Sequence, residues 1–111
     1  MKTINVKSWY DFPKKFTGIA IYLDGSKCWY VEGKHHRLDG PAIEYADGSK
    51  FWYVEGKYHR LDGPAIEWAD GSKYWCIEGK YLTFQQFWER MKDTDYAPRI
   101  MAYMLGAKCK P

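Results

Sequence analysis

Long apolar runs are missing from this chain of 111 residues. Nowhere do 18 consecutive apolar residues occur, and no apolar run of signal-peptide length follows the start, Met1–Lys7. A membrane-spanning helix needs about 20 predominantly apolar residues, and a secretory signal peptide needs a shorter apolar segment near the start. We therefore expect a soluble, cytoplasmic protein that does not bind membranes.

Cysteine is scarce, and its three positions, Cys28, Cys76 and Cys109, share no spacing. An odd count without a repeated interval argues against a disulfide framework. A zinc site built from cysteines would show at least one CxxC pair, and the chain has none. We expect reduced thiols, no metal site and no other cofactor.

A strong excess of one charge is also missing. Lysine and arginine number 17 against 14 acidic residues, and up to Leu82 the counts are 12 and 11. Proteins that bind nucleic acid usually carry a basic stripe. The near balance makes nucleic-acid binding the second hypothesis and not the first.

What the chain has is a repeat with a period of 23 residues. Trp29–Lys34 recurs at 52–57 and, less well preserved, at 75–80. Between these copies His36–Glu44 returns unchanged at 59–67. Identity at a fixed period indicates one small structural unit that was copied and stacked. Stacked arrays present extended binding surfaces, so a binding function is favoured over catalysis.

Each unit reads as a β-hairpin. Residues 41–46 predict a short strand, Asp47-Gly48 a tight turn, and the aromatic run 50–54 a second strand. Alternation along that second strand places Trp52 and Val54 on one face and Phe51 and Tyr53 on the other. The predicted fold is mainly β with a C-terminal α part: an antiparallel β-hairpin meander of period 23, capped by one or two short helices.

The ends of the chain break the period. Thr83 and Gln86 have the spacing of a capping box, which predicts a helix from about 84 to 91, and a second helix is expected between about 95 and 105. These helices should cover an aromatic spine on one face and shield the last strand edge. We expect a single domain, 1–111, with an atypical N-terminal cap at 1–16 that is aromatic and irregular over 8–16, repeats at 17–82 and a helical C-terminal cap at 83–111.

The motif His-Arg-x-Asp, at 36–39 and 59–62, is the one sequence pattern that suggests catalysis. Histidine and aspartate can form an acid–base pair. Catalytic groups have unequal roles, however, whereas this motif is duplicated without an accompanying nucleophile, and Asp-Gly-Pro is typical of turns. Equivalent histidines would lie two strands, about 9–10 Å, apart, too far to share a metal. We therefore expect a protein that is not an enzyme.

Two periodic sets of side chains support the nucleic-acid alternative. Tryptophans at 29, 52 and 75 form a column that could stack on bases, and two lysine ladders could contact phosphates. Aspartates and glutamates recur with the same period, which favours cross-strand ion pairs on a solvated face. The ladders are Lys27, Lys50 and Lys73, with Lys34, Lys57 and Lys80, beside Asp24, Asp47 and Asp70, with Glu32, Glu55 and Glu78.

The pattern Trp-Tyr-x-x-Gly-Lys-x-His-Arg-x-Asp-Gly-Pro-Ala, over about 17–82, resembles a MORN-like repeat found in short bacteriophage and bacterial proteins. It departs from the common MORN pattern, because Trp-Tyr-x-x-Gly replaces Tyr-x-Gly, which speaks against lipid binding. The resemblance implies a β-hairpin scaffold without catalytic residues. It also suggests a phage-encoded inhibitor or modulator of a host protein or defence system such as CRISPR, acting in the host cytoplasm.

The expected partner is a host or phage protein, and a strand edge could also pair two copies into a homodimer. Repeated tyrosines supply rigid contact area, and the repeated basic and histidine positions lie beside them in the sequence. The partner-binding residues that we expect are Tyr30, Tyr53, Lys34, Lys57, His36, His59, Arg37 and Arg60.

Overall fold

The computed structural model describes residues 2–6 and 14–105, and the remaining positions, including much of the expected N-terminal cap and the end of the tail, lie outside the described residues. The described part is mainly β with two C-terminal helices, which confirms the expected fold class. Its elements are β1 (Thr3–Val6), β2 (Gly18–Tyr22), β3 (Lys27–Val31), β4 (Lys34–His35), β5 (Ile43–Glu44), β6 (Lys50–Phe51), β7 (Tyr53–Val54), β8 (Lys57–Tyr58), β9 (Ile66–Glu67), β10 (Lys73–Ile77), β11 (Lys80–Leu82), α1 (Phe84–Met91) and α2 (Ala97–Met104).

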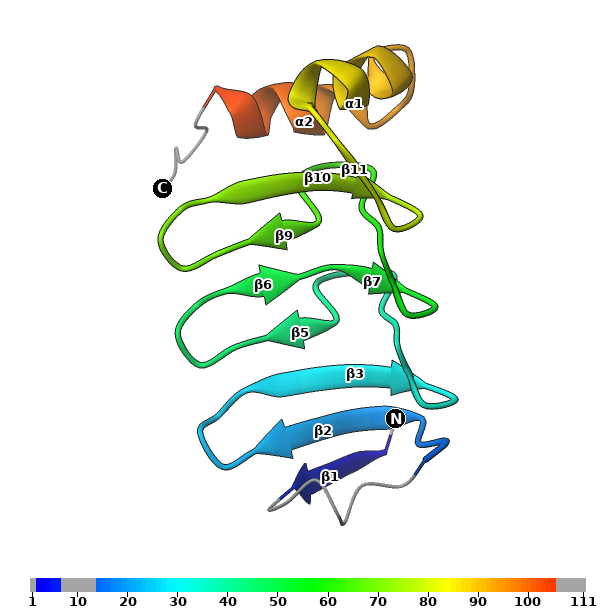
Figure 1. Cartoon of the computed structure of the whole chain (residues 1–111), viewed down its shortest axis with the longest axis vertical. Coiled ribbons are helices and arrows are strands. Elements are labelled where there is room, and N and C mark those ends of the chain that lie inside the picture. The colour runs from blue at the N-terminus through cyan, green and yellow to red at the C-terminus, as the bar shows by residue number, and fades with distance from the viewer. Residues whose placement is uncertain (1, 7–13, 106–111) are drawn as a thin grey trace.

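The units stack along the long axis of a molecule that measures 43 × 28 × 22 Å (Figure 1). The main sheet runs in the order β1-β2-β3-β5-β6-β9-β10-β11. Its strand pairs are antiparallel except for β1, which pairs in parallel with β2. The helices lie at the C-terminal end of the stack, against β10 and β11 (Figure 1).

Two short strands can pair side by side with the same edge of one longer strand. The first half of β3 pairs with β5, and its second half pairs with β4. Since β4 and β5 occupy the same row, residues 36–42 between them must leave the sheet. We call this segment the first connecting loop, and its repeat at 59–65 the second connecting loop.

This division explains why the strands are shorter than expected. The predicted strand at 41–46 is reduced to Ile43–Glu44, and the one at 50–54 is interrupted at Trp52. The backbone N–H of Trp52 donates to Ala65, whereas its carbonyl accepts from His59. Trp52 therefore lies between β6, which pairs with β9, and β7, which pairs with β8.

The strand β1 was not expected. The sequence marks 1–16 as an atypical cap without indicating a strand in it, and Thr3–Val6 extends the sheet beyond the first hairpin. The side chains of Ile4 and Val6 lie on the same side of the sheet and pack with Phe16 and Ala20. The N-terminal end thus closes with a small apolar cluster of its own.

Two kinds of turn repeat along the array. In the Asp-Gly turns the aspartate Oδ1 accepts the backbone N–H of the serine two residues later. Ser26 and Ser49 are buried, and each Oγ accepts an N–H from the next unit, at Ala46 and Ala69. These serines therefore fasten one unit to the next.

The Glu-Gly turns have positive φ at both residues, 50° to 51° at the glutamates and 81° to 83° at the glycines. This conformation suits two-residue hairpin turns because its twist matches that of the strands. It is uncommon for a residue with a side chain, and the array holds it three times, at Glu32, Glu55 and Glu78.

The pleat separates the sheet into two chemically distinct faces, and the alternation expected for 51–54 is confirmed by the contacts of Phe51 and Tyr53 with the same ring, Tyr58. One face, the aromatic face, includes no Lys, Arg, Asp or Glu among the strand residues that the structure describes. It consists of the strand residues Ile4, Val6, Gly18, Ala20, Tyr22, Cys28, Tyr30, His35, Ile43, Phe51, Tyr53, Tyr58, Ile66, Tyr74, Cys76 and Tyr81, with Tyr45 and Trp68 directly after β5 and β9.

The opposite face, the charged face, carries a row of cross-strand neighbours of alternating sign. Lys27, Glu44, Lys50, Glu67 and Lys73 face one another in successive pairs. The expectation of mixed-charge neighbours is confirmed for Lys27, Lys50 and Lys73, although with other acidic residues than expected. It is wrong for Lys34, Lys57 and Lys80, which stand opposite Val31, Val54 and Ile77. The aspartates and glutamates at the turns, which were expected to pair, instead build the turns themselves.

The C-terminal cap begins as expected. Thr83 Oγ1 accepts the N–H of Gln86, and Gln86 Oε1 accepts the N–H of Thr83, which completes the capping box. The helix α1 spans the expected residues, and α2 lies within the expected range. Among residues 2–6 and 14–105, no helix is long and apolar enough to cross a membrane.

The helices cover less of the sheet than expected. Only Trp75 of the tryptophan column packs beneath them, against Phe84, Phe87 and Tyr103. Trp29 and Trp52 lie too far along the stack and are covered by the connecting loops instead. The aromatic spine under the helices is therefore wrong for two of its three rings.

Candidate functional site

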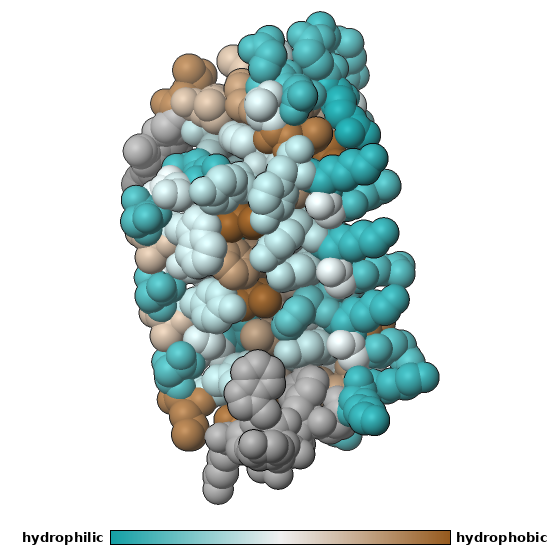
Figure 2. All heavy atoms as spheres, viewed as in Figure 1, coloured by the Kyte–Doolittle hydropathy of each residue, from teal (hydrophilic) through white to brown (hydrophobic). Residues whose placement is uncertain are grey.

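The aromatic face is an extended uncharged surface of the sheet, as far as the structure describes it. Figure 2 shows this side, where pale aromatic side chains surround apolar ones over the central strands. Tyr45, Trp68, Tyr74 and Tyr81 are 42%, 46%, 46% and 62% exposed. Beneath such rings the apolar floor is buried, since Phe51 is flanked edge-on by Tyr45 and Trp68. A single layer of strands thus obtains a core from its own tyrosines.

A continuous column of rings crosses this face. Tyr30 packs on His35 at 4.5 Å between ring centroids, His35 on Tyr53 at 5.1 Å, and Tyr53 on Tyr58 at 4.5 Å. Burial raises the pKa of Tyr30 and of Tyr53 above the ordinary value. Both hydroxyls therefore stay protonated at neutral pH and can donate hydrogen bonds.

His35 interrupts this column of tyrosines. Its Nδ1 is buried and has no hydrogen-bond partner among the described residues. Burial lowers the pKa of His35 below its ordinary value, because the imidazolium loses hydration between the two rings. The equivalent positions in the next units are Tyr58 and Tyr81.

We expect His35 to make stability depend on pH between about 7.5 and 5.5. The pKa of His35 is lower in the folded state than in the unfolded state. The free energy of unfolding is therefore highest at pH values above the unfolded-state pKa, and it decreases as the pH falls through that pKa. The variant His35→Tyr carries the residue of the equivalent position and should show a smaller decrease. Urea unfolding of both proteins at pH 7.5 and 5.5 measures this, and equal decreases would contradict the expectation.

The charged face is organised around two arginines. The guanidinium of Arg37 lies 3.9 Å from the ring centroid of Trp29, and that of Arg60 lies 3.8 Å from the ring centroid of Trp52. Arg60 donates to Asp62 (2.8 Å), Glu67 (3.0 Å) and the Pro64 carbonyl (3.0 Å). Arg37 makes the equivalent bonds to its own loop, at 2.9, 3.3 and 3.1 Å. Each connecting loop is therefore fixed over a tryptophan.

The histidines of the same motif bond elsewhere. Nδ1 of His36 accepts the backbone N–H of Glu55, and Nδ1 of His59 accepts that of Glu78, each at 3.0 Å. These bonds hold the strained Glu-Gly turn of the following unit. Because aspartate and histidine are used by different partners, the motif builds the array and is not arranged as an acid–base pair.

Neither thiols nor metal ligands form a reactive centre in the part of the chain that the structure describes. Burial raises the pKa of Cys28 and of Cys76 to about 11, so both thiols stay protonated. No group of three or more His, Cys, Asp or Glu side chains in residues 2–6 and 14–105 is placed to hold a metal ion.

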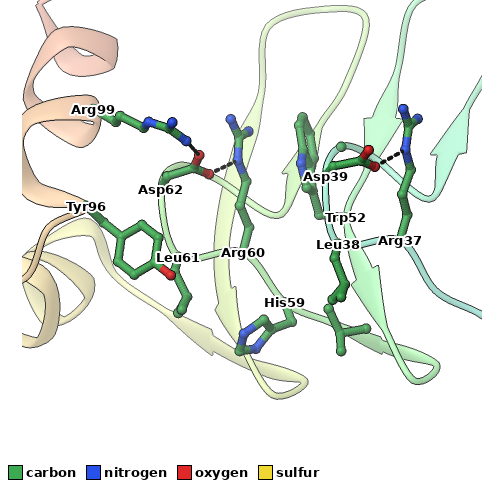
Figure 3. A pocket seen from close by; sticks show the side chains of 12 residues that line it. Arg37, Leu38, Asp39, Trp52, His59, Arg60, Leu61, Asp62, Tyr96 and Arg99 are labelled. Carbon is green, nitrogen blue, oxygen red and sulfur yellow. Dashed lines mark hydrogen bonds and ion pairs between the residues drawn. The ribbon is translucent and has the colours of Figure 1, made fainter.

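A groove of about 690 Å³ lies on the charged face, between the two connecting loops and the start of α2 (Figure 3). The first loop contributes Leu38 and Asp39, and the second contributes Leu61 and Asp62. Tyr96 and Arg99 of the helical cap complete its wall, with Arg99 bonded to Asp62.

The expected partner-binding residues do not form one surface. Tyr30 and Tyr53 lie in the column of rings on the aromatic face. Arg37 and Arg60 stack on tryptophans of the charged face, and the neighbouring histidines bond to the Glu-Gly turns. Lys34 and Lys57 are exposed beside the Glu-Gly turns, each against the glycine of the next unit. The sequence reasoning missed the exposed rings Tyr45, Trp68, Tyr74 and Tyr81 and the groove residues Leu38, Asp39 and Arg99. Strand alternation carried a signal for Tyr74 and Tyr81.

Comparison of the chain with models of protein families, with curated proteins and with solved structures finds no match in any of the three. What the chain does must therefore be inferred from its own surfaces.

Proposed function

We propose that this chain is a non-enzymatic protein-binding module that contacts its partner through the aromatic face. The observation that supports this most strongly is the exposure of Tyr45, Trp68, Tyr74 and Tyr81 on a face that the C-terminal helices leave uncovered. Tyrosine and tryptophan are enriched at protein interfaces, where they bury large rigid areas at low entropic cost.

The charge of this face favours protein over nucleic acid as the partner. Binding to a phosphate backbone depends on lysine and arginine, and the described strand residues of the aromatic face include neither. On the opposite face Lys27, Lys50 and Lys73 stand opposite glutamates in the strand register, whereas Lys34, Lys57 and Lys80 stand opposite Val31, Val54 and Ile77. A partner surface with apolar side chains and hydrogen-bond acceptors, and with little charge, fits the phenol rings and their hydroxyls.

For the identity of the partner we propose a host protein, such as a component of a defence system, which a phage-encoded chain would block or redirect. The support for this is the resemblance of the repeated Trp-Tyr-x-x-Gly-Lys segment to short phage proteins. No catalytic step is needed for such a role, because occupying a functional surface of the partner is sufficient.

The test is capture from a bacterial lysate with the tagged chain as bait, followed by quantitative mass spectrometry with and without nuclease. The variant Tyr74→Ser/Tyr81→Ser removes two stacked, exposed rings of the aromatic face. The control Leu23→Ser/Leu105→Ser removes two apolar side chains outside it that are even more exposed. Since one hot-spot ring contributes about 2 kcal/mol, we expect the first variant to lose at least about thirtyfold in capture and the control to lose little.

Equal capture by both variants would show that the aromatic face is not the contact surface. Loss of all capture after nuclease treatment would support nucleic acid as the ligand. Circular dichroism of each variant should match that of the parent, so that unfolding does not imitate a loss of binding.

A further inference from the structure

The two connecting loops have the same sequence but different surroundings. In the second loop Leu61 packs against the cluster under the helices, and the Asp62 side chain is 28% exposed. In the first loop Leu38 is 80% exposed and the Asp39 side chain 86%. The cap of this protein thus covers one copy of a surface and leaves the other copy open.

In the covered copy, the second connecting loop, the contacting segment is α2. Asp62 receives Nε of Arg60 on Oδ1 and Nη1 of Arg99, from α2, on Oδ2 at 3.1 Å. Tyr96 lies three residues before Arg99 and lines the same groove, so both come from one side of the helical segment (Figure 3). In the groove, Leu61 and Asp62 of the loop thus lie beside an aromatic ring at the N-cap of α2 and an arginine in its first turn.

The open copy offers the same groups. Asp39 Oδ1 accepts Nε of Arg37, as Asp62 does from Arg60, and the first loop has no counterpart of Arg99 among the described residues. The groove beside it, about 690 Å³, is of the size that accommodates a few side chains. A helix would lie over this groove and insert its side chains.

Asp39 is the carboxylate of this face that is open to a further cation. Asp62 already binds Arg60 and Arg99, and Glu44 and Glu67 stand opposite lysines in the strand register. Asp39 binds Arg37 through Oδ1, and its side chain is the most exposed of the four carboxylates that bind arginine here.

From these observations we infer that the first connecting loop is a docking site for a helix of a partner protein that carries an arginine three residues after an aromatic residue. Leu38 contacts the aromatic ring, and Asp39 Oδ2 accepts the arginine. This site lies on the charged face and is independent of the aromatic face, so either can fail without the other.

The probe is a peptide of residues 93–105 of this chain, cross-linked to keep its helix, because α2 is the segment seen on the equivalent loop. It is titrated into the intact, isotope-labelled protein and followed by NMR. We expect the largest shifts at residues 36–41. Asp39→Asn should weaken binding about fivefold, the upper range for an exposed ion pair, and Leu38→Ser should weaken it further.

Matched controls keep the test specific. Leu23→Ser removes a leucine of the same exposure from an Asp-Gly turn and should leave the affinity unchanged. A peptide with glutamine in place of Arg99 should bind to the parent as weakly as the original peptide binds to Asp39→Asn. The inference is overturned if the peptide fails to bind, binds elsewhere, or binds with the same affinity to the Leu38→Ser and Asp39→Asn variants.

Discussion

Replacing Arg60 by alanine should lower the free energy of unfolding by about 3 kcal/mol. The side chain is mostly buried, covers the ring of Trp52, and donates to two carboxylates and a carbonyl. Its loss leaves Asp62 and Glu67 with fewer partners in a partly buried position, and an unpaired buried charge is strongly unfavourable. Urea unfolding followed by tryptophan fluorescence measures the change.

The matched control is Arg37→Ala, which removes the same bonds from the first loop. We expect a smaller loss, about 1 to 2 kcal/mol, because Asp39 and Glu44 are better solvated than their counterparts. Each arginine bonds the same kinds of groups, so the difference between the variants reports the surroundings of these groups: their burial and the additional bond of Arg99 to Asp62. Equal losses would mean that stacking on tryptophan, and not the ion pairs, determines the contribution of each arginine.

Replacing Phe87 by alanine should have the largest effect on stability, about 4 kcal/mol. The ring is fully buried, and its centroid lies 4.8 Å from that of Trp75 beneath the two helices. Its removal leaves a cavity where the helical cap meets the sheet, in a cluster that also holds Ile77, Met91 and Ile100. Urea unfolding followed by tryptophan fluorescence, to which Trp75 contributes, measures the loss.

Phe84→Ala is the control for this variant. Phe84 touches the same tryptophan at 5.0 Å but is only partly buried, so we expect a loss of about half that size. Hydrogen exchange of the β11 amides should accelerate in Phe87→Ala, because the cap protects that end of the sheet. If Phe87→Ala costs less than Phe84→Ala, the cap is not packed as described.

Local patterns in the sequence were sufficient to predict the repeats and the first helix. The Asp-Gly turns and the capping box of Thr83 depend on residues two or three positions apart, and such spacings can be read directly. The strand β1 could not be predicted in this way, because Thr3–Val6 pairs in parallel with a strand 16 residues later and no tight turn joins them.

The candidate sites depend on longer distances. Arg60 follows Trp52 by eight residues, and nothing local shows that the loop folds back over the ring. The contact of Arg99 with Asp62 spans 37 residues and requires the placement of both helices. Side chains of the aromatic face follow strand alternation, but whether any layer covers them was decided by where α1 and α2 pack.

The hydrogen bonds of the connecting loops and of the buried serines reach only to adjacent units. The array ends at Thr83, which occupies the repeat position of Arg37 and Arg60 and begins the helical cap instead. Duplication or deletion of one 23-residue segment in the gene would therefore give every remaining contact an equivalent partner. The two end caps would be unchanged. Evolution could lengthen or shorten this protein in steps of one unit, and each step would alter the area of the uncharged face without redesigning the fold.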